Sequence, residues 1–266
     1  MTHTLINAYC LDYLKGTPQT WTSICADPPD NIGLGYQSYK DKLPDDQYVG
    51  LLETWLYLFV HRAKTVWFSY NAKWTFAVGR IVSAMVKRTP GLEAKPCVQT
   101  FTFGQHCHHD LGNNHRPLLR LRWFDAPLRP DAIRVPSWRQ ENGDKRADPR
   151  GRVPGDVFDF TRVVGNSKQR RPWHPTQLNE GLVERCIRLT TPEGETVLDP
   201  FAGTGTTLRA CKRTGNPCTL IELDPGYCAK IAEEHGLIPQ PYASKSPAIQ
   251  RPMPPATTRV LPAPAE

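Results

Sequence analysis

Apolar residues recur along this chain with two different spacings, and the two alternate. Short apolar runs with the length of buried strands are followed by longer segments with apolar residues at helical spacing, such as 47–62 and 75–88. This alternation favours one α/β domain with a mostly parallel sheet and helices on both faces. Two further runs, 97–105 and 118–124, have the pattern of an antiparallel pair, and we expect them at one edge of the sheet.

Residues 197–207, VLDPFAGTGTT, mark a turn between a strand and a helix. The apolar strand ends at Asp199, and Gly203 and Gly205 allow backbone angles that a side chain would forbid. A helix-compatible segment follows, so its N-terminus stands behind the glycines, where doubly wound sheets bind nucleotide-like ligands. Nineteen residues after Gly203, Glu222 stands near the end of the next strand, at the usual place of an acceptor for ribose hydroxyls.

The glycine turn differs from two common nucleotide sites. It lacks the third glycine of a dinucleotide site and the Lys-Ser/Thr pair of a triphosphate-binding loop. Phe201, just before the glycines, suits an apolar, zwitterionic ligand better than a pyrophosphate. These residues alone leave open a doubly wound domain that binds another adenosine ligand.

The sequence SICADPPDN, residues 23–31, ends another apolar strand with two prolines. The prolines fix an extended, rigid turn directly after Asp27. Such a turn can hold the Asp27 carboxylate and the Pro28 carbonyl side by side, so that each accepts a hydrogen bond from an exocyclic amino group. Read alone, Asp-Pro-Pro is also an ordinary loop sequence.

Together, DPFAGTG at 199–205 and DPPDN at 27–31 resemble the two motifs of the S-adenosylmethionine-dependent DNA amino-methyltransferases, which act on adenine N6 or cytosine N4. The Asp-Pro-Pro turn precedes the glycine turn, as in the permuted, beta-type group of that family. The resemblance implies a permuted Rossmann-like sheet, S-adenosyl-L-methionine as the cofactor and a target-recognition region between the motifs. We also expect the strand carrying Cys25 beside the strand that leads to the glycine turn, so that both motifs share one cleft.

The resemblance also implies roles for individual residues. The catalytic turn that grips the amino group consists of Asp27, Pro28, Pro29 and Asp30. The residues expected to bind the cofactor are Asp27, Thr176, Gln177, Asp199, Phe201, Ala202, Gly203, Thr204, Gly205, Thr206, Thr207 and Glu222. Thr176 and Gln177 are expected at the carboxylate end of the cofactor, although Thr176 also has the character of a helix cap.

One position departs from the family. An aromatic residue that stacks on the extruded base usually follows the two prolines, whereas this chain has Asp30. A carboxylate cannot stack, so we expect Tyr36 to supply the base-stacking ring. Asp30 is then expected to read the base or to orient Asn31. The other candidate rings are Trp67, Phe68 and Tyr70.

Positive charge is concentrated between the two motifs. The chain has 33 Lys and Arg against 26 Asp and Glu, and residues 116–171 contain fourteen of these cations and seven of the acids, so the rest is neutral. Interleaved aromatics and irregular structure suit a polyanion that presents bases to stack on. The side chains expected to contact double-stranded DNA are Arg134, Arg139, Lys145, Arg146, Arg150, Arg152, Lys168, Arg170 and Arg171. A solvated basic loop is the alternative.

The pattern predicts a methyltransferase domain over 1–238, with a target-recognition insertion at about 106–173, and a proline-rich tail at 239–266 that is extended or disordered. No apolar run reaches membrane-spanning length, and the N-terminus lacks the layout of a signal peptide. The eight cysteines are scattered without tight pairing, as expected of reduced thiols in a cytoplasmic protein.

Residues 105–110, QHCHHD, have metal-ligand chemistry, with Cys97 and His115 nearby. Adjacent residues cannot all face one ion, and methyl transfer from a sulfonium needs no metal. We therefore expect no metal site, with zinc as the alternative, and interpret this segment as a polar loop near the entrance for DNA. His108 or His109 is expected to touch a phosphate or the base there.

The function that the resemblance implies is site-specific DNA methylation at the exocyclic amino group of a flipped base. Adenine N6 is favoured because, in the family that the motifs resemble, Ser in place of Asp at the start of the turn leans towards cytosine N4. Three alternatives stay open: cytosine N4 methylation, methylation of RNA or a nucleotide, and a catalytically inactive DNA-binding protein. A restriction endonuclease is a candidate partner, and the sequence does not choose between a monomer and a dimer.

Overall fold

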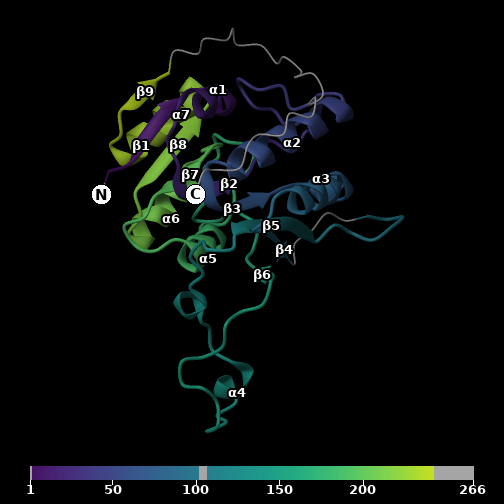
Figure 1. The fold of residues 1–266 in the computed structure, drawn as a ribbon, viewed down its shortest axis with the longest axis vertical. Helices are drawn as coiled ribbons and strands as arrows, with labels where there is room; N and C mark the ends of the chain where they lie inside the picture. Colours follow the sequence, from purple (N-terminus) through teal and green to yellow (C-terminus); the bar gives the residue numbers. More distant parts are fainter. Residues whose placement is uncertain (1, 102–106, 243–266) are drawn as a thin grey trace.

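The computed structural model describes residues 2–101 and 107–242 (Figure 1). Its strands are β1 (Thr4–Asn7), β2 (Trp21–Ala26), β3 (Ala63–Ser69), β4 (Leu92–Thr100), β5 (His115–Trp123), β6 (Val157–Asp159), β7 (Val197–Asp199), β8 (Cys218–Glu222) and β9 (Pro239–Pro241). These nine strands form one sheet in the order β6-β4-β5-β3-β2-β7-β8-β1-β9.

Within this sheet, β5 is antiparallel to both of its neighbours, β3 and β4, while the other pairings are parallel. The predicted antiparallel pair is therefore present as β4 and β5, although β4 begins at Leu92 and β6 forms the outer edge. β2 lies beside β7, with Ile24 opposite Leu198. Because the carboxyl ends of parallel neighbours meet at one edge of a sheet, the two motifs come together there.

Helices cover both faces of the sheet, as predicted. They are α1 (Cys10–Gly16), α2 (Asp45–Val60) and α3 (Thr75–Arg88) on one face, and α5 (Glu180–Thr190), α6 (Thr206–Thr214) and α7 (Pro225–His235) on the other. The described chain also contains the short α4 (Trp138–Glu141) and the 3-10 helices η1 (Ala72–Trp74) and η2 (Pro130–Ile133). α1, α2 and α3 share one buried core with the sheet, and α5, α6 and α7 share the other. The mostly parallel sheet with two helical layers confirms the predicted fold class.

The pattern of α2 shows how the sequence sets this packing. Leu52, Trp55, Leu56 and Phe59 recur at i, i+3, i+4 and i+7, and each is at most 1% exposed. Burying four such side chains contributes roughly 6–12 kcal/mol before the cost of ordering the chain. The helix therefore packs against the sheet along one apolar stripe, beneath the edge where the two motifs meet.

Residues 124–156 leave the sheet between β5 and β6, and we call them the basic lobe. The lobe carries α4 and projects away from the sheet, at the bottom of Figure 1. Its two sides are joined by a bridge between Val135 and Arg152. The predicted insertion at 106–173 is thus only partly an insertion, because β5 and β6 within it belong to the central sheet.

The domain boundary predicted at residue 238 falls inside the fold. β9 pairs in parallel with β1, and Tyr242 donates its backbone N–H to the Asn7 carbonyl and packs edge-on against Tyr13. The folded part therefore continues to residue 242, and the rest of the predicted tail, 243–266, lies outside the described residues. Among the helices that the structure describes, none has the length and apolar content needed to cross a membrane.

Candidate active site

A cleft opens where the carboxyl ends of β2 and β7 meet. It encloses about 1130 Å³ of empty space, counting its open mouth. Asp27 lines it from one side, the turn at 199–207 from another, and Glu222 from the end of β8. The structure therefore brings the two motifs to one cleft, as their predicted strand order requires.

The turn at 199–207 needs glycine at two positions. Gly203 has a φ of 51° and Gly205 a φ of 75°, in the left-handed region that favours glycine. A Cβ on Gly203 would also lie 3.3 Å from the His174 ring, tighter than most such contacts. The backbone N–H of Gly203 donates to Glu222 Oε2 at 2.8 Å, so the turn is fastened to the end of β8. Gly203 itself lines the cleft.

Two buried carboxyl groups face this turn. Asp199 accepts a hydrogen bond from the N–H of Phe201, and Glu222 accepts one from the N–H of Asp224, both at 2.9 Å. Burial raises the pKa of Asp199 to about 7 and the pKa of Glu222 to about 7. A cation or a hydroxyl donor brought by a ligand would favour the ionised form of each group.

The other residues of the turn that are expected to bind the cofactor either line the cleft or hold the backbone of the turn. Phe201 packs edge-on against Trp55, with ring centroids 5.1 Å apart, and forms an apolar wall of the cleft. Ala202 donates its N–H to the Ile221 carbonyl, and the hydroxyls of Thr204 and Thr206 lie 3.0 Å apart. Thr207 also lines the cleft, and its hydroxyl favours the ionised form of Asp199 by a hydrogen bond that lowers the pKa of that carboxyl.

Thr176 and Gln177 line the same cleft from the loop before α5. The alternative role of Thr176 as a helix cap is wrong, because the Asn179 side chain caps α5 by accepting from the N–H of Gly181. The Gln177 side chain accepts from the N–H of Arg171 and donates to the Gln169 carbonyl. Gln177 therefore holds its own loop in place at the wall of the cleft.

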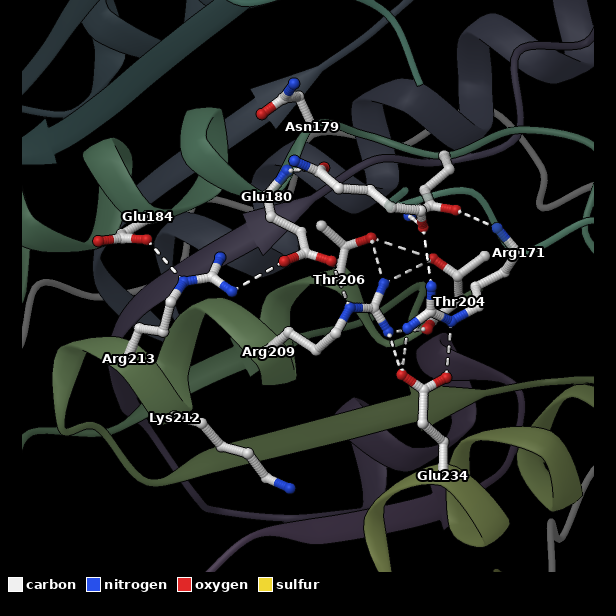
Figure 2. A network of polar contacts seen from close by, with 12 residues as sticks. Arg171, Asn179, Glu180, Glu184, Thr204, Thr206, Arg209, Lys212, Arg213 and Glu234 are labelled. Carbon is white, nitrogen blue, oxygen red and sulfur yellow. Dashed lines mark hydrogen bonds and ion pairs between the residues drawn. The ribbon is translucent and has the colours of Figure 1, made fainter. Parts of the chain in front are cut away.

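Behind the glycine turn lies a network of ion pairs centred on Arg209, which we call the Arg209 network (Figure 2). Arg209 donates to Glu180 Oε1 at 2.6 Å and to the Thr204 carbonyl at 2.8 Å, and it contacts Glu234 at 3.4 Å. Its other members are Arg171, Glu184, Thr206 and Arg213. The network ties α5, α6 and α7 to the back of the turn, and only scattered charges mark it in the sequence.

The Asp-Pro-Pro turn is held rigidly from below. The Tyr48 hydroxyl donates to the Pro29 carbonyl, and Trp74 Nε1 donates to the Asp30 carbonyl at 2.7 Å. Pro28 lies between Asp27 and these fixed points. The turn therefore has little freedom to move when a substrate group contacts it.

The continuation of the turn is fastened by Asp41, which is 2% exposed. Its carboxylate accepts the N–H groups of Asn31, Ile32 and Leu34 at 2.6, 3.2 and 2.9 Å. The Asn31 side chain exchanges two hydrogen bonds with the backbone of Leu43. Asn31, with a φ of 57°, is thus oriented by Asp41 and Leu43 and not by Asp30, contrary to one of the two roles expected for Asp30.

Sequence reasoning missed Arg116, at the start of β5. Arg116 Nη2 donates to Asp27 Oδ1 at 2.7 Å and to Asp30 Oδ1 at 2.9 Å, while Nη1 donates to Asp30 Oδ2 at 2.8 Å. Its Nε donates to the Ser69 hydroxyl at 2.6 Å. Burial raises the pKa of Asp27, and the Arg116 charge works against that rise. The unusual acid at position 30 was the available signal that a cation stands nearby.

The candidate stacking rings occupy different environments. Tyr36 is half-buried and lines the cleft, with its ring 5.6 Å from His174 and its hydroxyl 3.4 Å from that of Thr176. Trp67, Phe68 and Tyr70 are buried in the core, at 3%, 0% and 8% exposure. Phe68 and Tyr70 do not line the cleft, and Trp67 lines it with little exposed surface, so Tyr36 is the most accessible of the four rings.

The cations predicted to contact DNA differ in their partners. Arg134, Arg146 and Arg150 form ion pairs with acids of the same region, Asp131, Asp144 and Asp148. Arg171 belongs to the Arg209 network through Glu234, and Arg170 donates to the Arg171 carbonyl. The side chains at exposed positions include Arg139, Lys145, Arg152 and Lys168.

The predicted polar loop lies partly outside the described residues, since these omit 102–106. Cys107, His108 and His109 are exposed. Within the described ranges, no group of three or more His, Cys, Asp or Glu has the arrangement of a metal site. All eight cysteines are free thiols, and seven of them are buried.

The fold brings the Asp-Pro-Pro turn and the glycine turn together in one cleft, as expected for the methyltransferases that the two motifs resemble. The profile of a family described as DNA methylase, of N6 and N4 type, matches residues 22–234. The chain belongs to this N6/N4 DNA methylase family.

Individual relatives agree with this assignment. The chain is 27% identical over 238 residues to the Type II methyltransferase M.ScaI of Streptomyces caespitosus, which covers 82% of this chain and 76% of the relative. It is 27% identical over 250 residues to the DNA adenine methyltransferase YhdJ of Escherichia coli (strain K12), covering 84% and 79%.

Solved structures show the same fold at lower identity. The M1.HpyAVI–SAM complex superposes with a TM-score of 0.62 at 17% identity and covers 89% of this chain and 100% of that chain. The cytosine-N4-specific PvuII DNA methyltransferase superposes with a TM-score of 0.64 at 13% identity and covers 88% of each chain. These likenesses confirm the predicted Rossmann-like methyltransferase sheet.

S-adenosyl-L-methionine is the cofactor of this family, and the cleft fits it. Gly203 and Thr204 of the glycine turn line the cleft, and Phe201 offers an apolar wall. Asp199 and Glu222 are buried carboxyl groups that suit the positive charges and ribose hydroxyls of this molecule. The donor set therefore agrees with the cofactor predicted from the sequence.

Proposed function

We propose that this DNA methylase is site-specific and methylates the exocyclic amino group of a base flipped out of double-stranded DNA, with adenine N6 favoured over cytosine N4. The observation that supports this proposal is the placement of Asp27 in the cofactor cleft, on a turn whose backbone is fixed by Tyr48 and Trp74. Pro28, the next residue, has a carbonyl but no N–H, so this position can only accept hydrogen bonds.

The chemistry asks little of the protein beyond positioning. The cofactor supplies a methyl group on an electrophilic sulfonium. The amino nitrogen of a base is conjugated into its ring, so its lone pair is a poor nucleophile. Hydrogen bonds from that amino group to Asp27 and to the Pro28 carbonyl favour tetrahedral character at nitrogen and aim its lone pair. After transfer the nitrogen carries an extra proton, and the Asp27 carboxylate is the nearest base in the turn.

The remaining residues of the site bind the two substrates. Thr176 and Gln177 would lie at the carboxylate end of the cofactor, and Glu222 would accept its ribose hydroxyls. Tyr36 would stack on the flipped base, since it lines the cleft and is only half-buried. The exposed cations of the basic lobe, together with Lys168, would contact DNA phosphates.

The choice of base rests on the residue that opens the turn. In the family that the motifs resemble, Asp at this place leans towards adenine N6 and Ser towards cytosine N4. Relatives of both kinds exist, because YhdJ is named as an adenine methyltransferase and PvuII as cytosine-N4-specific. Asp27 therefore favours adenine in this chain.

One assay tests the reaction and the base together. Purified protein is incubated with isotope-labelled cofactor in three separate reactions, which contain duplex DNA, RNA or free nucleotides. The products are then digested and separated by mass. N6-methyladenine from duplex DNA is the expected product. N4-methylcytosine would overturn the choice of base. Label found only in RNA or nucleotides would overturn the choice of substrate, and no label in any of the three would overturn the proposed activity.

Asp27→Ala tests the role of the turn. The variant should lose methyl transfer and keep most of its cofactor affinity, measured by calorimetry, because Asp27 is only one of the residues expected to bind the cofactor and the glycine turn is unchanged. Asp46→Asn, an exposed acid on α2, is the matched control and should keep wild-type turnover. Transfer by Asp27→Ala at the wild-type rate would show that Asp27 is not the acceptor.

We also propose that the protein acts in the cytoplasm as the methylating member of a restriction–modification pair. M.ScaI is named as a Type II methyltransferase, and the eight free cysteines suit a reducing compartment. Host DNA from cells expressing the protein should resist cleavage by an endonuclease of the same recognition sequence, once that sequence is mapped. Unchanged cleavage of the mapped site would contradict the pairing.

A further inference from the structure

Asp30 stands where an aromatic residue is usual, and its surroundings show what it does. The residue is 7% exposed, and both of its carboxylate oxygens accept hydrogen bonds from Arg116, at 2.8 and 2.9 Å. This bidentate geometry is the strongest common form of an Arg–carboxylate pair. Asp30 is therefore directed at Arg116, below the surface of the cleft, and not at a base.

The reach of Arg116 to this place follows from the topology. β5 is antiparallel to β3, so its first residues lie at the carboxyl end of β3, where the Asp27 turn also stands. Arg116, the second residue of β5, also donates through Nε to the hydroxyl of Ser69, the last residue of β3. The guanidinium is thus held by Asp30 and Ser69 while its Nη2 points at Asp27 Oδ1.

The charges around Asp27 explain why a cation is needed there. Asp30 lies in the same turn, Asp199 lies across the cleft at the end of β7, and Tyr36 faces the cleft from the following loop. Burial and the charge of Asp30 both raise the pKa of Asp27, and Arg116 and the Ser69 hydroxyl lower it. A protonated Asp27 would lose the acceptor capacity that the reaction requires at one of its oxygens.

We propose that Arg116 is a positioning residue that keeps Asp27 ionised and fixes the orientation of its carboxylate, and that Asp30 occupies the position after the two prolines in order to hold Arg116. Asp30 thus stands at the position of the aromatic residue, but neither Asp30 nor Arg116 stacks on the base. The importance of this pair for methyl transfer rests on the proposed function, whereas its effect on Asp27 does not.

The first test measures Asp27 without any reaction. The side-chain carboxyl carbons of aspartate are labelled with 13C, the Asp27 signal is assigned by its loss in Asp27→Asn, and its titration is followed by NMR. In Arg116→Gln, the midpoint for Asp27 should move up by at least about one pH unit, because a unit charge in direct contact is lost. An unchanged midpoint in a folded Arg116→Gln protein would overturn the proposal.

A double variant separates the electrostatic role from a role in folding. Asp30→Asn combined with Arg116→Gln removes one negative and one positive charge, so the midpoint of Asp27 should return part of the way to its wild-type value. A purely structural role for Arg116 predicts no such recovery. Arg122→Gln is the matched control, because it lies on the same strand and pairs with the exposed Glu93, and it should leave the Asp27 midpoint unchanged.

The second test links the pair to turnover. The acid limb of the pH profile of kcat/KM should move to higher pH in Arg116→Gln by the same amount as the NMR midpoint. At a given pH on that limb, the rate should fall by at least about tenfold, and it should recover at higher pH. In Arg116→Lys, the acid limb should stay close to its wild-type pH, since the variant retains the positive charge. A shifted NMR midpoint with an unshifted acid limb would overturn the catalytic importance of the pair, and a wild-type protein without transfer would overturn the proposed function alone.

Discussion

Two largely buried arginines lie near the cleft, and each pairs with two carboxylates, but they have different roles. Arg116 contacts two carboxylates that belong to one turn, Asp27 and Asp30. Arg209 contacts two carboxylates from different helices, Glu180 of α5 and Glu234 of α7, and also the Thr204 carbonyl. Both side chains are mostly covered, at 20% and 10% exposure.

The difference lies in what each arginine joins. Arg209 joins separate helices to the glycine turn, so its loss should affect folding and cofactor affinity together. Arg116 joins residues that the turn already holds close, so its loss should mainly change the electrostatic environment of one carboxylate. A buried ion pair is therefore architectural or electrostatic according to the elements that it connects, and the two effects have different measurable signatures.

The largest effect is expected for Arg209→Leu. Without Arg209, Glu180 keeps only the more exposed Arg213 and Glu234 keeps only Arg171 as arginine partners, and the Thr204 carbonyl loses its charged donor. This loss should cost about 2 kcal/mol in the free energy of unfolding. Cofactor affinity should also fall by about tenfold, because the Thr204 carbonyl loses a charged donor that fixes the turn. Denaturant titration and calorimetry measure the two effects.

Arg213→Leu is the control for this change, since Arg213 also pairs with Glu180 but is 42% exposed and does not touch the turn. It should lower the free energy of unfolding by much less and leave cofactor affinity unchanged. Equal losses in both variants would show that Arg209 has no special connection to the turn.

A smaller effect, on rate more than on folding, is expected for Asp30→Tyr, which restores the usual residue of the family. Turnover should fall by about tenfold, because Arg116 loses its bidentate partner and no longer holds Asp27 correctly. The measurement is kcat for methyl transfer at saturating DNA. A rise in turnover would instead mean that position 30 is only a lost stacking position.

Tyr36→Ala completes that test from the other side of the cleft. Stacking on a flipped base contributes about 1–3 kcal/mol, so KM for DNA should rise by about tenfold while cofactor affinity stays the same. Tyr57→Ala, a half-exposed ring on α2, is the control and should change neither. An unchanged KM in Tyr36→Ala would remove Tyr36 from the base pocket.

The contrast between the two arginines also shows what the sequence can and cannot predict. The strand order, the shared cleft and the glycine turn follow from local patterns, because periodicity and turn residues act over a few positions. Arg116 is 86 residues from Asp30, and no local pattern links them. Its strand was predicted to begin at Leu118, so the residue that completes the site lay outside the predicted element.

The Arg209 network was unpredictable for a related reason. Its charges lie on three helices, α5, α6 and α7, and they meet only after the helices pack on the sheet. Arg171 was assigned to DNA from its place in a basic stretch, whereas the structure pairs it with Glu234. Charge counts along a chain cannot distinguish a cation that faces solvent from one that faces a helix.

Cofactor binding should depend on pH through Asp199 and Glu222, the buried carboxyl groups of the cleft that, unlike Asp27 and Glu180, form no ion pair with an arginine in the described residues. Burial raises the pKa values of Asp199 and Glu222 to about 7. If the bound cofactor favours their ionised forms, affinity should rise by about tenfold per group between pH 6 and pH 8, with proton release on binding. Calorimetry in buffers of different ionisation enthalpy measures both. Affinity that is flat across this range would contradict the roles of both carboxyl groups.

In the protein without cofactor, the same two carboxyl groups make the free energy of unfolding fall with rising pH, whereas cofactor affinity rises. The folded chain retains protons on Asp199 and Glu222 that the unfolded chain releases from about pH 4 upward. Their contribution to the free energy of unfolding therefore falls as the pH rises from about 4 to about 7, and it is constant above that range. Asp199→Asn should remove part of this slope in denaturant titrations without cofactor. A slope as steep as in the wild type would show that Asp199 ionises normally.

The smallest effect is expected in the basic lobe, where charges are exposed and act through solution. Arg146 and Arg150 pair with Asp144 and Asp148 two residues away, and exposed pairs of this kind contribute little to stability.

Lobe cations that contact phosphates instead release counterions, so each should add about 1 to the slope of log affinity for DNA against log salt. The double variant Arg139→Ala with Lys145→Ala should therefore lower that slope by about 2 and weaken binding severalfold at moderate salt, with the free energy of unfolding unchanged. Arg80→Ala, an exposed cation on α3, is the control and should leave the slope at its wild-type value. A double variant with the wild-type slope would mean that this lobe does not face DNA and that the solvated basic loop is the correct interpretation.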